Sequence, residues 1–284
     1  MIYLPILGAV ALGAGNILEK IVLKRRKVNI KLYQTASFLA IILTMLPFVF
    51  FFWRMNTQAL EISNILIFLL VIIFSLIANM FVFYSMKWEK LTNLEPAKIL
   101  EPLFIIFLAI IFSFFIDSGL YEKNLNVIIP ALIAGAALVF SHVKEHHLHF
   151  NKYFIAAILG SLFFALELVT SRLILDFYSP ITFYFIRCSS IFLISWIAFR
   201  PNFGKLSKKV RFEILATGII WVIYRLIVYY GYLNIGIIFT TLMIMLGPIF
   251  IYAFAYIFLK EKLNWRNITA AIIIVGSVLY ATLA

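Results

Sequence analysis

Three charged residues stand three positions apart in the stretch NLEPAKILEPLF, residues 93–104, where the sequence turns strongly apolar. They are Glu95, Lys98 and Glu101, which share one broad face of a helix, so that the Lys98 ammonium can reach either carboxylate. A charge in a membrane interior is costly and normally faces other helices or a watery cavity. Two interpretations stay open: an internal ion triad that sets helix packing, or direct contact with a substrate or a coupling proton.

Two prolines occupy similar apolar surroundings. Pro102 lies in LEPLF, residues 100–104, and Pro248 lies in LGPIF, residues 246–250. Proline has no backbone N–H, so it leaves a carbonyl of the preceding turn without its usual donor. We therefore expect either a kink or a carbonyl free for a ligand at both places.

A second set of charges occurs in apolar runs of the later sequence. Glu167, Arg187 and Arg225 each lie eight residues from an expected outer helix end, which places them about 12 Å deep. Their near neutrality is compatible with a structural pairing. The functional alternative is that Arg187 or Arg225 holds a carboxylate or phosphate, with Glu167 as proton carrier or amine partner.

The first half of the chain holds a corresponding set near the opposite surface. Asn79 and Lys98 each lie eight residues from an expected inner helix end, and Asn16 lies at comparable depth. The sequence therefore predicts two polar layers flanking the membrane midplane, with Glu101 between them. We predict these residues and the three deep charges of the second half as substrate-binding candidates.

An unusually aromatic segment, WVIYRLIVYYGY, spans residues 221–232. Trp221 and Tyr224 share one helix face, with Arg225 at its edge. Such a face can form a cage for a quaternary ammonium group. Because the chain is rich in aromatic residues throughout, ordinary packing is the favoured interpretation, and both residues are kept as substrate-binding candidates.

Three further charges, Glu19, Lys20 and Arg172, lie closer to expected helix ends. Long side chains at such positions commonly extend toward the membrane surface while their stems stay in the apolar layer. We therefore interpret these three as surface anchors.

No motif for catalysis or metal binding stands out. All four histidines occur in HVKEHHLH, residues 142–149, whose spacing matches no standard zinc site, so a solvated linker is expected. The sequence has no phosphate-cradling glycine loop, no Gly-x-Ser-x-Gly and no metal-hydrolase histidine pair. We expect neither an enzyme nor a cofactor.

The composition is that of a membrane protein. The 284 residues are 64% hydrophobic and 13% charged, whereas soluble domains are about half apolar and a quarter charged. Apolar runs long enough to cross about 30 Å of hydrocarbon recur ten times. No basic region precedes the first run, so no cleaved signal peptide is expected. The predicted spans are 2–23, 30–53, 62–87, 90–115, 124–141, 152–175, 179–199, 212–233, 236–259 and 265–283.

The net charge of +12 is distributed as a topology signal rather than as a nucleic-acid patch. Basic residues concentrate in alternate loops, whereas the intervening loops hold only Arg54 and Lys123. Basic loops normally stay on the inner side, which places both termini outside. The basic loop residues are Lys24, Arg25, Arg26, Lys27, Lys31, Lys87, Lys90, Lys144, Lys152, Arg200, Lys205, Lys208, Lys209, Arg211, Lys260, Lys262 and Arg266.

The chain also repeats itself. Three segments recur in the same order, in corresponding spans of the two halves. With five spans in each half, the second half enters from the opposite side, as in transporters built from inverted repeats. The matches are ILG (6–8 and 158–160), LEPLFIIFLAIIF (100–112) with LGPIFIYAFAYIF (246–258), and ALIAGAALVF (131–140) with AIIIVGSVLY (271–280).

These repeated segments carry a resemblance to a known family. LEPLF and LGPIF, with FLKEKL at residues 258–263 and the glycine-containing ends GAALVF and GSVLY, resemble the ten-helix EamA-type branch of the drug/metabolite transporter superfamily. The resemblance covers nearly the whole chain and implies a secondary transporter of small metabolites without a bound cofactor. The first half departs from it, because IDSGLYEK follows where the second half has FLKEKL. Since Leu-Glu-Pro belongs to the family pattern, Glu101 can also serve the fold.

The sequence thus predicts an all-α integral membrane protein with ten helices in two inverted repeats, residues 1–141 and 152–284, joined by a linker at 142–151. The predicted function is alternating-access transport of small polar metabolites across the cell membrane. The single substrate class that we predict is an amino acid. The buried acidic and basic residues are nearly equal in number, which suits a zwitterion.

Three alternatives stay open. A choline-like or drug cation would use Glu167 and the aromatic segment, and a sugar or nucleotide sugar would place phosphate between Lys98 and Arg225. An intramembrane enzyme acting on a lipid-linked substrate would also bury paired charges, but it would turn over in detergent without a gradient.

Overall fold

The computed structural model describes residues 4–116, 119–142, 151–250 and 265–283, with the backbone alone for residues 91–93, 95, 142 and 267. Within these ranges the chain is helical and forms no strand. The histidine-rich linker and the FLKEKL segment fall almost entirely outside them. The helices are α1 (Leu4–Leu23), α2 (Ile30–Phe52), η1 (Thr57–Leu60), α3 (Ile62–Trp88), α4 (Leu91–Lys98), α5 (Leu100–Phe115), α6 (Leu125–His142), α7 (Lys152–Leu175), α8 (Pro180–Phe199), η2 (Phe203–Lys205), α9 (Lys208–Asn234), α10 (Ile237–Ile244) and α12 (Trp265–Leu283).

Polar capping residues fix where several helices begin. The side chains of Asn29, Asn151, Ser179 and Ser207 accept hydrogen bonds from N–H groups in the first turns of α2, α7, α8 and α9. Such caps satisfy backbone donors that have no partner inside the helix. The Ser207 cap corrects one predicted boundary, because α9 includes a charged first turn from Lys208 that lies outside the predicted apolar run.

Seven helical segments of the described chain are long and apolar enough to cross a membrane by length and composition. Three shorter apolar helical segments, Leu125–Ser141, Ile237–Phe250 and Ile268–Leu283, occupy the remaining predicted spans. Each predicted span therefore contains helix where the structure describes it. The ninth, 236–259, is described only to residue 250.

The predicted proline kinks are confirmed. The span predicted as 90–115 is two helices, because α4 ends at Lys98 and α5 begins at Leu100. Pro102 lacks the N–H that would bond to the Lys98 carbonyl, and its ring crowds that carbonyl. Pro248 stands in the same relation to Ile244, the last residue of α10.

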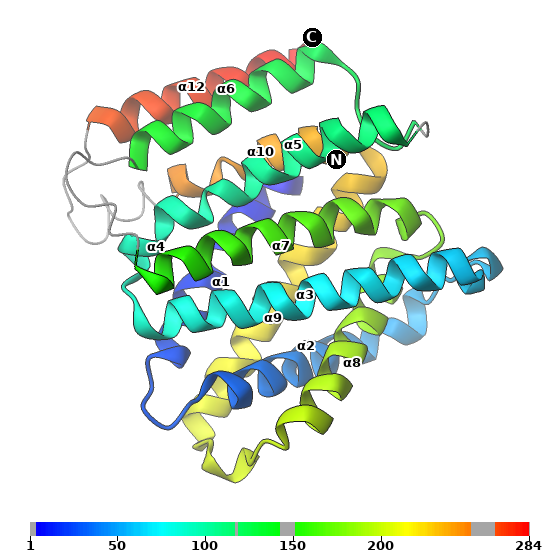
Figure 1. The fold of residues 1–284 in the computed structure, drawn as a ribbon, viewed down its shortest axis with the longest axis vertical. Coiled ribbons are helices and arrows are strands. Elements are labelled where there is room, and N and C mark those ends of the chain that lie inside the picture. The colour runs from blue at the N-terminus through cyan, green and yellow to red at the C-terminus, as the bar shows by residue number, and fades with distance from the viewer. Residues whose placement is uncertain (1–3, 117–118, 143–150, 251–264, 284) are drawn as a thin grey trace.

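Helices from the two halves of the chain interleave (Figure 1). The pair α6 and α12 lies at one end of the molecule, and α2 and α8 lie at the other. Between them, α3 packs along α7, and α1 packs along α9. The buried apolar core runs through these contacts and surrounds the polar residues described below.

The carboxyl ends of α1 and α3 are each capped by a lysine from the other helix. The Lys87 ammonium donates to the backbone carbonyls of Leu23 at 2.9 Å and Val28 at 2.6 Å. In return, the Lys20 ammonium donates to two carbonyls at the end of α3, one of them that of Met86. A cation at a helix carboxyl end satisfies free carbonyls and opposes the negative end of the helix dipole. The pair therefore ties these two helix ends together.

A carboxylate from the first half caps a helix of the second half. The Glu122 carboxylate accepts from the backbone N–H of Ile238 at 3.1 Å and of Phe239 at 3.0 Å, at the start of α10. Burial raises the pKa of the Glu122 carboxyl, and the backbone donors oppose part of that rise. Gly236, the residue immediately before α10, has a φ of +90°. A Cβ on this residue would lie 2.0 Å from a Glu122 oxygen. The glycine at position 236 therefore leaves the space that the Glu122 carboxylate occupies.

Replacing Glu122 with alanine is expected to lower the free energy of unfolding by about 1–2 kcal/mol, the usual cost of losing a helix cap. Thermal unfolding of the purified protein measures it. Glu61→Ala is the control, since Glu61 precedes α3 but forms no side-chain cap there. Equal losses in the two variants would show that the Glu122 contact contributes nothing specific.

Candidate functional site

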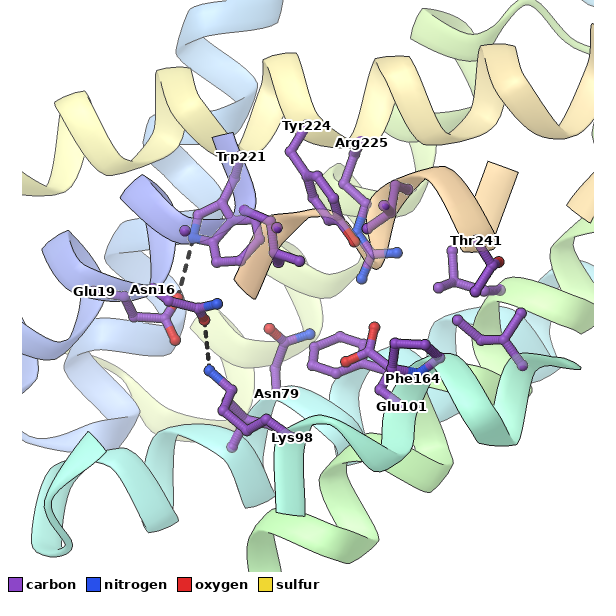
Figure 2. A pocket seen from close by; sticks show the side chains of 18 of the residues that line it. Asn16, Glu19, Asn79, Lys98, Glu101, Phe164, Trp221, Tyr224, Arg225 and Thr241 are labelled. Atoms are coloured by element: carbon purple, nitrogen blue, oxygen red, sulfur yellow. Dashed lines mark hydrogen bonds between the residues drawn. The ribbon is translucent and has the colours of Figure 1, made fainter. Parts of the chain in front are cut away.

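A cavity of about 130 Å³ lies among the helices, between α9 on one side and α4 and α5 on the other (Figure 2). Helices α1, α2, α3, α7, α8 and α10 also contribute to its wall. Eight of the nine predicted site residues line it, and the ninth, Glu167, lies directly behind the wall. The polar lining residues are Asn16, Glu19, Ser37, Asn79, Lys98, Glu101, Tyr184, Arg187, Trp221, Tyr224, Arg225, Tyr232 and Thr241.

The deep charges of the second half form one buried cluster. Glu167 accepts hydrogen bonds from Arg187 and, at 2.9 Å, from the Tyr229 hydroxyl, which itself accepts from Arg187 at 2.6 Å. Relative exposure is 0% for Glu167, 2% for Arg187 and 6% for Arg225. These contacts bear out the structural pairing, and they show that three helices, α7, α8 and α9, meet at one carboxylate.

Arg225 is held less completely than Arg187. Its Nη1 lies 3.3 Å from Glu167 Oε2, within ion-pairing distance, but the geometry gives no hydrogen bond, and neither atom has another partner among the described residues. Its guanidinium carbon lies 5.2 Å from the Phe164 ring centroid and 5.6 Å from that of Tyr224. These contacts with the ring faces orient the guanidinium toward the cavity and leave it a donor to offer a ligand (Figure 2).

Glu101 faces Arg225 across the cavity (Figure 2). It lies in the first turn of α5, just after the helix break, and no described side chain hydrogen-bonds or ion-pairs with its carboxylate. The same break turns Lys98 the other way, so that its ammonium donates to Asn16 Oδ1 on α1. The interpretation as an ion triad is therefore wrong for Lys98 and Glu101, and the Glu95 side chain lies outside the described residues.

The interpretation of three charges as surface anchors is wrong. Glu19, Lys20 and Arg172 are all buried. Lys20 caps α3, as described above, and Arg172 donates to Asp176 at 2.6 Å, one turn later on the same chain. Glu19 and Lys20 therefore find partners inside the protein, whereas Arg172 pairs with a half-exposed aspartate at the end of α7.

Glu19 is a cavity residue that the sequence reasoning missed. Its Oε2 accepts a hydrogen bond from Trp221 Nε1 at 3.1 Å. Two glycines allow this approach: a Cβ on Gly8 would lie 3.0 Å from Ile227, and one on Gly15 would lie 3.2 Å from the Trp221 ring. Gly8, Gly15 and Glu19 are spaced seven and four residues apart and share one helix face. That spacing is the signal that Glu19 faces a helix and not lipid.

The remaining lining residues add neutral polar groups. Asn79 donates to the Ser75 carbonyl at 2.6 Å, which leaves its amide oxygen available to the cavity. Trp221 and Tyr224 pack edge to face with ring centroids 5.5 Å apart. Thr241, on α10, has a buried hydroxyl without a partner among the described residues.

The cavity therefore has two polar ends. One holds Glu19 and Lys98, with Asn16 and Trp221 as their hydrogen-bond partners. The other holds Glu101 opposite Arg225. Apart from Arg187, which Glu167 neutralises, each end carries one acidic and one basic side chain. The cavity therefore suits a small molecule that itself carries both charges or none.

The contacts separate structural charges from available ones and so predict different variant stabilities. Glu167→Gln removes the charge that compensates buried Arg187, and it should cost about 3–5 kcal/mol of unfolding free energy. Glu101→Gln breaks no contact with a described residue and should cost about 1 kcal/mol or less. Thermal unfolding of the two purified variants tests this difference. A larger loss for Glu101→Gln would contradict the assignment.

Comparisons with known proteins agree with this architecture. The EamA-like transporter family matches residues 151–283. No curated protein matches the sequence. A solved structure titled only "Crystal structure of protein" is 14% identical, with 97% of each chain covered and a TM-score of 0.63, and this likeness shows the fold alone. With the apolar helices, the family match indicates a multi-pass membrane protein of a transporter type. The match places residues 151–283, the second half of the chain, in the drug/metabolite transporter superfamily.

Proposed function

We propose that this protein is a secondary transporter that carries a small polar metabolite across the membrane by alternating access. The observation that carries the proposal is the cavity itself, where acidic and basic side chains from both halves of the chain converge inside apolar helices. Transporters of this kind bind substrate near the midplane, beside helices that are interrupted. Here the breaks before Pro102 and Pro248 both lie at the cavity wall.

The proposed architecture is two inverted repeats, residues 1–141 and 152–284, joined by a linker at 142–151. The packing supports it: exchanging each helix of one half for its counterpart turns the α3–α7 contact into α9–α1 and leaves α2–α8 and α6–α12 unchanged. The family match also covers the proposed second repeat. We further propose the cell membrane as the location, with the basic loops inside and both termini outside.

The proposed substrate is an amino acid. A zwitterion can place its ammonium against Glu101 and its carboxylate against Arg225, the two charged groups that face each other with unused hydrogen-bonding capacity. A guanidinium suits a carboxylate because it can donate two parallel hydrogen bonds. Glu167 then acts as a positioning residue, because its carboxylate is already engaged by Arg187 and Tyr229.

A small organic cation is the second candidate. Trp221 and Tyr224 present aromatic surface to the cavity beside the Glu19 carboxylate, a combination that binds ammonium groups. A nucleotide sugar has less support, because Lys98 and Arg225 engage different partners at the two ends of the cavity.

Uptake into proteoliposomes against panels of amino acids, amines and sugars tests the proposal. Amino-acid uptake is expected, with a loss of about tenfold or more in Glu101→Gln, because a charged hydrogen bond contributes about 1.5–3 kcal/mol. Ser113→Ala is the control on the same helix, since the Ser113 hydroxyl, among the described residues, bonds only to the Ile110 carbonyl of its own helix.

Three outcomes would redirect or overturn the assignment. Uptake of amines alone, lost in Trp221→Leu, would favour the cation. Equal uptake by Glu101→Gln and the parent protein would remove Glu101 from the substrate site. Consumption of a lipid-linked compound in detergent, without a gradient, would indicate an enzyme instead.

A further inference from the structure

A second hollow lies on the outer face of the helices, between the amino end of α2 and the later turns of α3. Its volume is about 740 Å³. It is distinct from the central cavity, because the two share no lining residue in the described part of the chain. The groove residues, as we name them, are Asn29, Ile30, Lys31, Leu76, Ile77, Met80, Phe81 and Tyr84.

The groove changes from polar to apolar along its length. Asn29, Lys31 and Tyr84 supply polar groups where α2 begins and α3 nears its end. Leu76 and Ile77 lie two turns earlier on α3, about 12 Å from Tyr84 along the helix. This gradient follows that of a bilayer leaflet, in which headgroups lie above acyl chains.

The polar end of the groove carries excess positive charge. Lys31 and the neighbouring loop residues Lys24, Arg26 and Lys27 are exposed, and no acidic side chain pairs with any of them among the described residues. Arg25, in the same loop, is already bound by Glu213. The Lys31 ammonium lies 5.5 Å from the centroid of the ring of Phe199, the last residue of α8, which does not line the groove among the described residues.

We propose that the groove residues bind an anionic phospholipid. Its phosphate lies at Lys31 and the adjacent basic loop, and one acyl chain lies along Leu76, Ile77 and Phe81. Basic pockets between membrane helices are suited to anionic headgroups. This inference depends on the protein being in a membrane and is independent of which solute it carries.

The position of the groove gives the lipid a route to affect transport. Asn79 lines the central cavity, while its neighbour Met80 on α3 lines the groove. A bound chain therefore packs against the same turn of α3 that forms the cavity wall. Its presence is expected to hold α3 against α2, which α3 contacts far less than it contacts α7.

Thermal unfolding of the full-length protein in detergent tests the proposal, with phosphatidylglycerol or phosphatidylcholine of identical chains added. Phosphatidylglycerol is expected to raise the midpoint by about 3 °C or more above the value with phosphatidylcholine. Lys31→Gln should abolish this difference. Lys209→Gln should retain it, because Lys209 is also exposed and second in its helix but lies outside the groove.

A second pair of variants tests the apolar part. Ile77→Trp fills the groove and should reduce binding of phosphatidylglycerol, counted by native mass spectrometry, by about tenfold. Ile73→Trp, one turn earlier on an exposed surface outside the groove, should not. Because neither variant changes Lys31, this pair tests the proposed lipid site even if Lys31→Gln fails to fold.

Three results would overturn the proposal. They are equal midpoints with the two lipids, an undiminished difference in Lys31→Gln, and unchanged lipid binding in Ile77→Trp. Glycerol phosphate, which has no acyl chains, is tested in the same way. If it raises the unfolding midpoint as much as phosphatidylglycerol does, the site binds free phosphate and not lipid.

Discussion

The buried carboxylate of Glu167 is the interaction on which the cavity depends. It lies where α7, α8 and α9 meet, and it balances Arg187 while drawing Arg225 to within 3.3 Å. Two guanidinium groups without it would be unpaired in an apolar interior, a state that proteins avoid because uncompensated buried charge is strongly destabilising. With Glu167 in place, Arg187 is fixed, and Arg225 keeps a donor directed at the cavity. The fully buried Glu167 carboxylate therefore leaves the Arg225 guanidinium available to a ligand in the cavity.

The same constraint governs the backbone. Free donors and acceptors at helix ends cannot be left unsatisfied away from water, and here several are satisfied by side chains distant in sequence. Lys20 and Lys87 close the carboxyl ends of α3 and α1, and Glu122 closes the amino end of α10. The last of these contacts joins the first half of the chain to the second on the side opposite the lysine pair.

Much of this arrangement follows from local sequence. The helix breaks near Pro102 and Pro248 agree with the missing N–H, although Pro47 and Pro130 lie within unbroken helices. The burial of Glu167, Arg187 and Arg225 agrees with their positions in apolar runs. What could not be predicted depends on tertiary approach. Glu19 is buried because the glycine face of α1 admits Trp221, and Lys98 bonds to Asn16 because the helix break turns it away from Glu101. Tyr229 completes the Glu167 cluster, yet nothing in the sequence distinguishes it from the other tyrosines of its helix.

The most direct measurement of the central claim, that the cavity admits water and substrate, is thiol labelling of Asn79→Cys in a Cys188→Ser background. Proteoliposomes would be treated with a membrane-impermeant thiol reagent, with Glu61→Cys, immediately before the same helix, as an exposed control. Labelling of position 79, slowed by the transported solute while position 61 is unaffected, is the predicted result. An unreactive position 79 from either side of the membrane, with position 61 fully labelled, would contradict a substrate cavity at this place.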